Sequence, residues 1–347
     1  MIVPTRSRAP LRLGLAGGGT DLSPYSDEFG GAVLNTTIGR YAFAFIEPAH
    51  ESRVTFIADD LDISETFPAD LDAMTSAKLI LHAGVYRRMI RQFHGGRPIA
   101  MRVATSVDAP AGSGLGSSSA LVVALVEAFR AALNIPLSPY EVAHLAFEIE
   151  RLDLNLPGGK QDQYAAAFGG INFIEFIGGD RVIVNPLRVH PAALNEFETS
   201  IIVCFSGVSR NSEHIIAEQR HGMTKAGLAL DALHQLKADA IDMKQALFRG
   251  DISEMARLLN RSWLAKKNTA SGVSTDCIDQ LLSTAMRAGA LAGKVSGAGG
   301  GGFIMLVVPP EQRAAIIRAL NNAGAIATGV EFTQRGAESW IMPGWTS

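Results

Sequence analysis

The chain has 347 residues, of which 47% are hydrophobic and 19% charged, a globular composition and a length typical of two domains. Its net charge of -3 disfavours a nucleic-acid binder, and its two cysteines exclude a disulfide framework or a cysteine-based zinc site. The apolar runs fall far short of the ~20 residues of a membrane span and none forms a signal peptide, so we expect a cytoplasmic protein without a membrane partner.

The first part of the chain combines strands with one inserted helix. Alternating and β-branched residues predict strands at Arg12–Leu15, Val33–Ile46, Arg53–Ile57 and Ile99–Val107. Helical spacing predicts a helix at Thr75–Phe93. A Gly/Ser-rich loop at 109–118 then opens an apolar helix at Ser119–Leu133. The next helix is expected to start at Pro139, because Ser138 and Glu141 have the spacing of a capping box.

The second half mixes the two kinds of element less regularly. The turn at 178–180 separates the strands of a predicted hairpin. The later strands are expected at Thr199–Phe205, Phe303–Val308 and Ile326–Phe332, and the helices within 212–248 and at Ile252–Lys267, Thr275–Ala288 and Glu311–Asn322. Because strict βαβ alternation is missing, the pattern favours an α+β fold. Pro186 and Pro191 mark the best boundary, which predicts domains at 1–190 and 191–347.

A phosphate-binding loop is the strongest functional signal. It comprises Pro110, Ala111, Gly112, Ser113, Gly114, Leu115, Gly116, Ser117, Ser118 and Ser119. The first N–H groups of a helix lack partners within it, and glycines let phosphate oxygens approach them. The alternative is a flexible entrance to a capped helix, for which one serine would suffice. The loop is not a Walker A loop, because no Gly-Lys-Ser/Thr follows, and no protein-kinase motif is present.

Two acidic residues follow this loop. Glu150 ends an apolar stripe on the helix that starts at Pro139, so it points inward, where a carboxylate needs a cation or hydrogen bonds. Mg²⁺ beside a phosphate loop would satisfy it, and an ion pair with a Lys or Arg is the alternative. Asp162 follows a Pro-Gly-Gly turn, and its position alone is compatible with a turn former or a cap as well as with a functional carboxylate.

Two further segments contain glycine clusters. Arg12 lies in an apolar strand, where a charged residue must be paired, and this strand stops at Gly17–Gly19, before Thr20 and Asp21. Asp21 is either a turn residue or an acceptor for sugar hydroxyls. The second cluster, at 297–302, joins a helix to a strand, and its five glycines favour a functional loop over a β-bulge or a tight crossing.

Over almost the whole chain, these segments resemble in order and spacing the motifs of the GHMP kinase superfamily, named for galactokinase, homoserine kinase, mevalonate kinase and phosphomevalonate kinase. The segment 110–120 resembles the family's Pro-x-x-x-Gly-Leu-Gly-Ser-Ser-x-Ala signature, and 9–21 and 294–302 resemble its first and third motifs. The resemblance implies an N-terminal domain like domain 2 of ribosomal protein S5 and a ferredoxin-like C-terminal domain. It also implies ATP and Mg²⁺ as cofactors, with ATP between the domains and its phosphates on the loop at 112–118.

The resemblance implies roles for individual residues. Ser118 and Glu150 match the family's Mg²⁺ ligands, Asp162 its catalytic aspartate and Arg12 the basic partner of that aspartate. The residues implied to contact the acceptor are Gly17, Gly18, Gly19, Thr20, Asp21, Asp162, Arg210, Gly299 and Gly300. Galactokinases have Gly-Glu-His where this chain has Gly17–Gly19, which argues against galactose as the acceptor.

Within the superfamily, the run LGLAGGGTDL at 13–22 resembles the D-glycero-D-manno-heptose 7-phosphate kinase branch, as do 206–210 and 266–274. This implies an ATP-dependent sugar kinase that phosphorylates the anomeric hydroxyl to give the 1,7-bisphosphate, for nucleotide-activated heptose and capsule or surface polysaccharide. An L-fucose kinase or another sugar 1-kinase is the first alternative. A non-catalytic nucleotide-sensing protein on the same fold is the second, and it would be expected to have lost Asp162 or the metal ligands.

An acceptor that already bears a phosphate needs a second anion site, made of Lys, Arg or free N–H groups. Because Arg12 is assigned to Asp162, the site must come from other cations. The candidates are Lys160, Arg210, Lys266 and Lys267. Arg210 is favoured because it lies in a loop after a strand, where ligand contacts concentrate. The expected partners are thus ATP and a small sugar phosphate and no nucleic acid, and a homodimer is left open.

Overall fold

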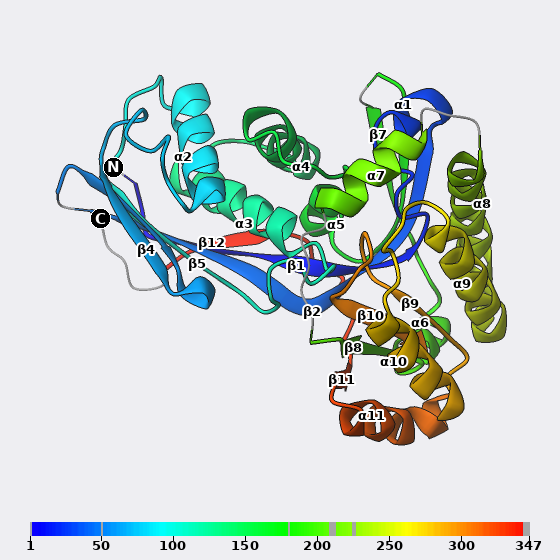
Figure 1. Ribbon diagram of the computed structural model, residues 1–347. Helices are drawn as coiled ribbons and strands as arrows, with labels where there is room; N and C mark the ends of the chain where they lie inside the picture. The colour runs from blue at the N-terminus through cyan, green and yellow to red at the C-terminus, as the bar shows by residue number, and fades with distance from the viewer. Residues whose placement is uncertain (1, 50, 180, 208–212, 224–226, 343–347) are drawn as a thin grey trace.

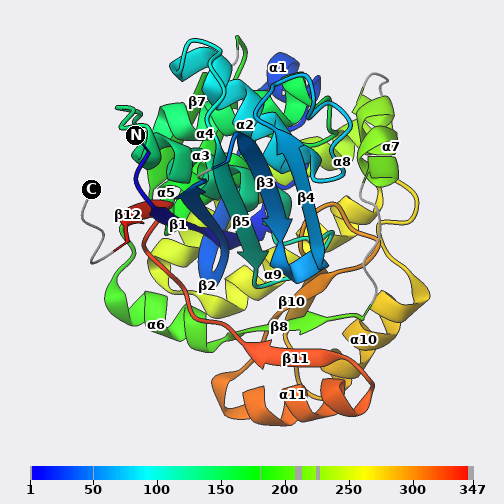
Figure 2. The ribbon, with the colours of Figure 1, turned by 90° about the vertical axis from the view of Figure 1, so that its left-hand side faces the viewer.

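The structure of the protein is a computed structural model that describes residues 2–49, 51–179, 181–207, 213–223 and 227–342. Its strands form two separate sheets, and helices lie over and between them (Figures 1 and 2). Among the described residues no helix is long and apolar enough to cross a membrane.

The larger sheet contains eight strands, in the order β12-β1-β2-β5-β3-β4, with β6 added to β2 and β7 added to β6. These strands are β1 (Thr5–Ala16), β2 (Gly31–Pro48), β3 (Arg53–Ala58), β4 (Ile63–Pro68), β5 (Met101–Val107), β6 (Ile171–Ile177), β7 (Arg181–Pro186) and β12 (Glu338–Ile341). β2 pairs with β1 on one side, and on the other with β6 along its first half and β5 along its second half. One long strand therefore holds the whole sheet together.

Helices from both halves of the chain cover this sheet. In the first half they are α1 (Tyr25–Phe29), α2 (Ile80–Phe93), α3 (Ser117–Ala132), α4 (Pro139–Glu148) and α5 (Gln161–Phe168), with a short 3-10 turn η1 (Asp59–Leu61) and a π-helical turn η2 (Ile149–Asp153). α3 packs on β1 and β2, and most of its apolar side chains are buried there. This burial stabilises the start of α3 at the edge of the glycine-rich loop.

The smaller sheet has four antiparallel strands, in the order β11-β8-β10-β9. They are β8 (Ile201–Phe205), β9 (Ala292–Val295), β10 (Phe303–Val307) and β11 (Ile326–Gly329). Numbered within this part the order is 4-1-3-2, with α10 (Asp276–Arg287) and α11 (Arg313–Asn322) packed on the strands, and a 3-10 turn η3 (Pro310–Gln312) before α11. This is the expected ferredoxin-like arrangement.

A helical layer joins the two sheets. After α6 (Pro191–Thr199) and α7 (Glu213–Met223), the helices α8 (Leu228–Arg249) and α9 (Ile252–Lys267) pack against each other. α8 contacts β1 and β2, whereas α9 contacts both β1 and β9 (Figure 1). α9 thus brings side chains from the second half of the chain to the first strand.

The structure confirms the α+β expectation and most predicted elements, and it corrects several bounds. The helix predicted at Thr75–Phe93 begins only at Ile80: the residues before it form turns, and the carboxylate of Glu65, on β4, accepts hydrogen bonds from the N–H groups of Lys78 and Leu79 at the start of the helix. The helix predicted at Ser119 begins two residues earlier, at Ser117. The strands β4, β9 and β12 and the helices α1, α5 and α6 were not predicted.

The predicted division into 1–190 and 191–347 stays a prediction. Two connections cross it: β12, near the end of the chain, pairs with β1, and α8 packs on β1 and β2. The capping box of Ser138 and Glu141 is present as predicted, with each side chain bonded to the other residue's backbone N–H.

The two glycine-rich loops, 110–119 and 296–302, touch through their backbones. A Cβ atom on Gly114, which has φ +79°, would lie 2.2 Å from the carbonyl oxygen of Ser296, and one on Gly302 would lie 2.3 Å from that of Ser113. The N–H of Phe303 donates to the same Ser113 oxygen at 2.9 Å. The glycines are therefore required where the two parts of the molecule meet, because any side chain would push the loops apart.

We expect Gly114→Ala to lower the free energy of unfolding by about 2–4 kcal/mol, from backbone strain plus the clash with Ser296. Urea unfolding measures this loss. Gly96→Ala is the matched control, because Gly96 has φ +71° but no atom within 4 Å of an added Cβ, and it should lose only about 1 kcal/mol. Equal losses in the two variants would show that the loops do not need this close contact.

Candidate active site

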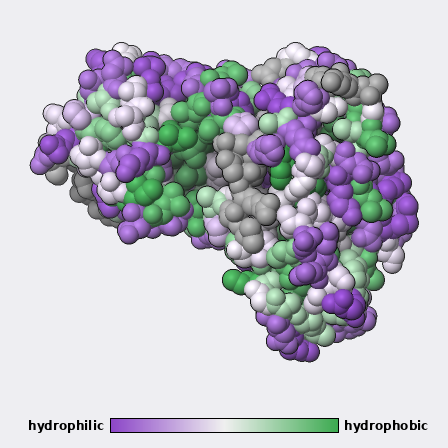
Figure 3. Space-filling view, in the orientation of Figure 1, coloured by the Kyte–Doolittle hydropathy of each residue, from purple (hydrophilic) through white to green (hydrophobic). Residues whose placement is uncertain are grey.

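One cavity of about 650 Å³ lies where the part of the molecule with the larger sheet meets the part with the smaller sheet. Most residues predicted from the sequence line it: Arg12, Gly17, Gly18, Gly19, Asp21, Ala111, Gly112, Gly114, Gly116, Ser117, Ser118, Ser119 and Asp162. Segments far apart in the chain, from β1, the start of α3, α5 and α9, contribute to it. In the space-filling view, apolar residues gather on the left lobe, next to the middle of the molecule (Figure 3).

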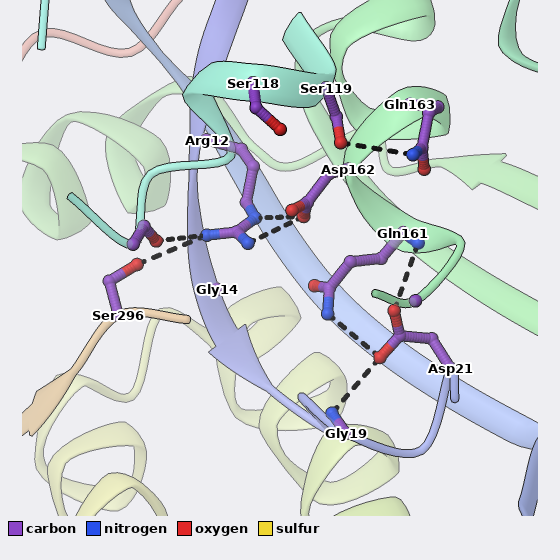
Figure 4. Close-up of polar contacts among 12 residues, drawn as sticks. Arg12, Gly14, Gly19, Asp21, Ser118, Ser119, Gln161, Asp162, Gln163 and Ser296 are labelled. Atoms are coloured by element: carbon purple, nitrogen blue, oxygen red, sulfur yellow. Dashed lines mark hydrogen bonds and ion pairs between the residues drawn. The ribbon is translucent and has the colours of Figure 1, made fainter. Parts of the chain in front are cut away.

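An ion pair between Arg12 and Asp162 lies at the centre of the cavity. The Nε and a terminal nitrogen of Arg12 lie 2.7 and 2.6 Å from Oδ1 of Asp162, and the other terminal nitrogen donates to the carbonyl of Gly114 at 2.6 Å. This nitrogen also lies 3.4 Å from Oγ of Ser296, so Arg12 is held between the aspartate and the second glycine loop (Figure 4). The predicted need for a partner of Arg12 is thus met.

Asp162 keeps one oxygen available. It is the second residue of α5, where a carboxylate interacts favourably with the helix dipole, and its side chain is 22% exposed. Its Oδ2 has no hydrogen-bond partner among the described residues, whereas Oδ1 is engaged by Arg12. A Cβ on Gly116 would come within 3.3 Å of Oδ2, so the glycine-rich loop lies directly against this carboxylate. A ligand hydroxyl can therefore donate to Oδ2 beside the loop.

Glu150 and Ser118 form a pair of oxygen donors next to the loop. Glu150 is fully buried in the π-helical turn η2, and its Oε1 accepts the hydroxyl of Ser118 at 3.0 Å. Its Oε2 accepts the amide of Gln163 at 2.5 Å, and Arg151 lies 3.7 Å from Oε1. A carboxylate and a hydroxyl beside a phosphate loop suit Mg²⁺, and Ser118 lines the cavity with Glu150 directly behind it. The residues therefore fit the predicted ion, although in the described part of the chain no three His, Cys, Asp or Glu side chains cluster.

Asp21 is held tightly by its neighbours. Its carboxylate accepts the N–H of Gly19 at 3.1 Å and both the backbone N–H and the side-chain amide of Gln161, at 3.2 and 3.0 Å (Figure 4). These contacts tie the glycine turn to the residue before Asp162. Asp21 also lines the cavity, so its role as an acceptor of sugar hydroxyls stays a prediction. Thr20, also predicted to contact the acceptor, is fully buried and donates to the carbonyls of Gly17 and Ala32.

Two buried lysines reach the cavity from the second half of the chain. Lys266, on α9, donates to the carbonyl of Gly18 at 3.0 Å, and Lys294, on β9, donates to that of Gly14 at 2.7 Å. Their exposed fractions are only 5% and 7%. Lys294 was missed in the sequence because the strand β9 that contains it was not predicted; a lone charge in an apolar strand is the signal that identified Arg12.

Burial controls the protonation of both lysines. It lowers the pKa of Lys266 to about 8, against a favourable interaction with Asp21. Burial, together with the positive charges of Lys266 and Arg12, lowers the pKa of Lys294 to about 7. Neutral pH therefore lies close to the titration of both groups.

The other predicted cations lie elsewhere. Lys267 is exposed and lies over the ring of Trp263, and Lys160 lies 3.8 Å from a carboxylate oxygen of Asp27. Neither lines the cavity. Arg210 lies outside the described residues.

The second glycine loop meets the cavity at other positions than those predicted. Gly297 and Ala298 line it, whereas Gly299 and Gly300 do not. A Cβ on Gly299 would lie 2.7 Å from the carbonyl of Val273, and the N–H of Gly300 donates to the same oxygen. The close approach that the glycine cluster indicated is thus made to the protein's own backbone. Pro110, Ser113 and Leu115, in the first loop, also do not line the cavity.

One end of the cavity is apolar, and the sequence did not indicate it. Its lining includes Ala58, Leu61, Leu79, Ile80 and Leu121. They come from β3, η1, α2 with the residue before it, and α3, so no local motif joins them. Here His82 is buried against Thr105, and burial lowers its pKa to about 4, which keeps the ring neutral.

Comparisons with known proteins agree with this geometry. The sequence matches the GHMP kinases N terminal domain over residues 80–170 and the GHMP kinases C terminal domain over 243–326. It is 40% identical to the D-glycero-alpha-D-manno-heptose 7-phosphate kinase of Campylobacter jejuni subsp. jejuni serotype O:2, over 96% of this chain and 98% of that protein. It is 28% identical to the L-fucokinase/L-fucose-1-P guanylyltransferase of Bacteroides fragilis, over 84% of this chain and 33% of that protein.

A solved structure shows the same fold. The D-glycero-D-manno-heptose 1-phosphate kinase from Bacteroides thetaiotaomicron has a TM-score of 0.82 and 43% identity, over 97% of this chain and 99% of that one. The fold class and the family resemblance inferred from the sequence are therefore confirmed.

The lowered pKa of Lys294 predicts a pH-dependent stability. Between about pH 7 and pH 10.5 the unfolded chain holds the lysine proton and the folded protein does not, so the free energy of unfolding rises with pH. Relative to Lys294→Met, which lacks the group, we expect the wild-type protein to gain up to about 1.4 kcal/mol per pH unit in this window. Urea unfolding from pH 7 to 10 measures the difference. The exposed Lys267→Met should follow the wild type, and parallel curves for Lys294→Met would contradict the prediction.

Proposed function

This chain belongs to the GHMP kinase family, and we propose that it transfers the γ-phosphoryl group of ATP to the anomeric hydroxyl of D-glycero-D-manno-heptose 7-phosphate. The product would be the 1,7-bisphosphate. The observation that best supports this proposal is the Arg12–Asp162 ion pair, whose free carboxylate oxygen lies against the glycine-rich loop in the shared cavity. A phosphate donor and a hydroxyl acceptor can meet there.

The nucleotide would occupy the side of the cavity formed by the first loop. The unpaired N–H groups at the start of α3 would bind its phosphates, as helix N-termini do, and the apolar end beside Leu79 and Leu121 suits a purine base. Ser118 and Glu150 would hold Mg²⁺, which when bound neutralises charge on the β- and γ-phosphate oxygens. The buried Gln163 amide orients the Glu150 carboxylate toward Ser118.

The acceptor hydroxyl would donate to Oδ2 of Asp162. As its oxygen bonds to the γ-phosphorus, the O–H proton passes to this carboxylate and ADP leaves with the electrons of the broken P–O bond. Arg12 keeps the carboxylate aligned through its bonds to Oδ1 and to the Gly114 carbonyl. The same ion pair thus positions the acceptor and fixes the loop that would hold the donor.

The names of two relatives specify two similar substrates. The Campylobacter jejuni enzyme is named for heptose 7-phosphate and the Bacteroides thetaiotaomicron structure for heptose 1-phosphate, so both names specify a phosphorylated heptose. The L-fucokinase alternative has the weaker support of 28% identity. The nucleotide-sensing alternative is disfavoured because Arg12, Asp162, Ser118 and Glu150 are all present and in contact as pairs. We place the enzyme in the cytoplasm, in the supply of activated heptose for capsule or surface polysaccharide.

A panel of sugar acceptors tests the proposal. ADP release is measured with heptose 7-phosphate, heptose 1-phosphate, heptose, mannose and L-fucose at saturating ATP and Mg²⁺. We expect kcat/KM for heptose 7-phosphate to exceed that for each of the others by at least ~10-fold, because only it combines a free anomeric hydroxyl with a phosphate group. Preference for heptose 1-phosphate or L-fucose would replace the proposed acceptor, and ATP binding without turnover of any sugar would support the sensor.

Asp162→Asn tests the role of the carboxylate. The amide cannot take up the proton, so we expect kcat to fall by at least ~100-fold while the KM for ATP changes little. Steady-state kinetics with heptose 7-phosphate measure both. Asp153→Asn is the matched control, because Asp153 pairs with Arg88 away from the cavity and should retain full kcat. Near-normal turnover in Asp162→Asn would reject the assignment.

A further inference from the structure

We propose that Lys266 and Lys294 together form the binding site for the phosphate group that the acceptor sugar already carries. This inference rests on the proposed function, which requires a phosphorylated acceptor but does not say what binds its phosphate. Sequence reasoning placed Lys266 among four candidate cations and did not consider Lys294.

The two lysines differ from other buried charges near the cavity. Arg12 has Asp162 as its ion-pair partner, but among the described residues neither Lys266 nor Lys294 is within ion-pair distance of a carboxylate. Each donates one hydrogen bond to a backbone carbonyl and retains two further N–H bonds. Burying an unpaired ammonium group is unfavourable, so a ligand that brings negative charge would be strongly favoured here.

The charges that face the lysines favour an anion. Arg12 and Asp162 neutralise each other, and the carboxylate of Asp21, which accepts three N–H groups, offsets part of the charge of Lys266. Positive charge remains in excess, and a phosphate monoester carries close to two negative charges at neutral pH. This excess of positive charge favours a phosphate over a neutral hydroxyl as the ligand of the two lysines.

The lysines also lie at a suitable place along β1. Arg12 and Gly14 are two residues apart on one face of the strand, about 6.5 Å, and Lys294 bonds to Gly14. Lys266 bonds to Gly18, in the turn that follows the end of β1 at Ala16. A seven-carbon sugar with its C1 hydroxyl at Asp162 would therefore extend along β1 toward the lysines with its C7 end.

The glycine turn provides the space for this arrangement. A Cβ on Gly19 would lie 3.0 Å from Nζ of Lys266, and nothing lies within 4 Å of the corresponding position on Gly18. The turn therefore has no side chains that would fill the volume above it, and the lysine from α9 reaches in instead. Galactokinases have Gly-Glu-His where this chain has Gly17–Gly19, and the space that the lysine occupies explains why side chains are absent here.

Binding of a phosphate should change the protonation of the lysines. Burial holds the pKa of Lys266 at about 8 and that of Lys294 at about 7, with Arg12 lowering both and Asp21 raising the first. A bound dianion favours the charged ammonium groups and raises both pKa values. At pH 8, where a sugar phosphate is already a dianion, its binding should therefore be accompanied by uptake of about one proton or more.

The test compares Lys266→Met and Lys294→Met with wild type on heptose 7-phosphate and on unphosphorylated heptose. We expect each variant to raise KM for the phosphate by about 10- to 100-fold while KM for heptose changes less than about 3-fold. Lys267→Met, one residue away and exposed, is the matched control and should change neither value. If both acceptors suffer equally, or if kcat alone falls, the lysines do not bind the acceptor phosphate.

A second measurement needs no variant. Titration calorimetry of wild-type enzyme at pH 8, in two buffers with different ionisation enthalpies, counts the protons taken up with heptose 7-phosphate and with heptose. We expect proton uptake when heptose 7-phosphate binds and none when heptose binds. No proton uptake with heptose 7-phosphate overturns the inference, even if a variant fails to fold. If wild type does not prefer heptose 7-phosphate over heptose, the proposed function itself is wrong; a preference that survives both lysine changes rejects only the lysine site.

Discussion

A guanidinium group buried in strand β1 is the charge around which the site is arranged. Because an isolated buried charge is unfavourable, Arg12 must find acceptors, and it finds them on three separate segments: Asp162 on α5, the carbonyl of Gly114 and the hydroxyl of Ser296. Satisfying one side chain therefore positions the carboxylate, the first glycine loop and the second glycine loop together (Figure 4).

The backbone contact between the loops gives this arrangement its rigidity. Gly114 and Gly302 place main-chain atoms of the two parts at distances that no side chain allows, and the N–H of Phe303 bonds across the junction. The first loop is further supported from behind by α3, whose apolar side chains pack into the core of the larger sheet. A loop held on both sides can keep its N–H groups directed at a ligand without reorganising.

Two buried positive charges lie where the two parts of the molecule meet, and the fold alone does not need them. Lys266 and Lys294 are buried, and within the described ranges neither has a carboxylate partner, so they lose hydration and regain only a hydrogen bond to a carbonyl. Such strain at a functional site is stabilised by the rest of the structure, here by α9 and β9 packing against each other. Two buried cations in a cavity beside the Arg12–Asp162 pair support the proposal of a site for an anion.

Local features of this chain were determined by the sequence itself. The capping box at Ser138, the apolar helix α3 and the glycine-rich approach to it depend on residues within a few positions of one another, so their conformations follow from propensity and periodicity. Arg12 required a partner on burial grounds alone, although only the resemblance to a family pointed to Asp162, 150 positions away.

Tertiary structure decided everything that depends on distant segments meeting. No local pattern shows that Lys294 reaches Gly14, that β12 returns to β1, or that Leu79 and Leu121 share one end of the cavity. The bounds of α2 changed for the same reason, since the carboxylate that holds Lys78 and Leu79 comes from β4. Contacts of this kind depend on the packing of whole sheets and helices, which the residues on either side of a position do not encode.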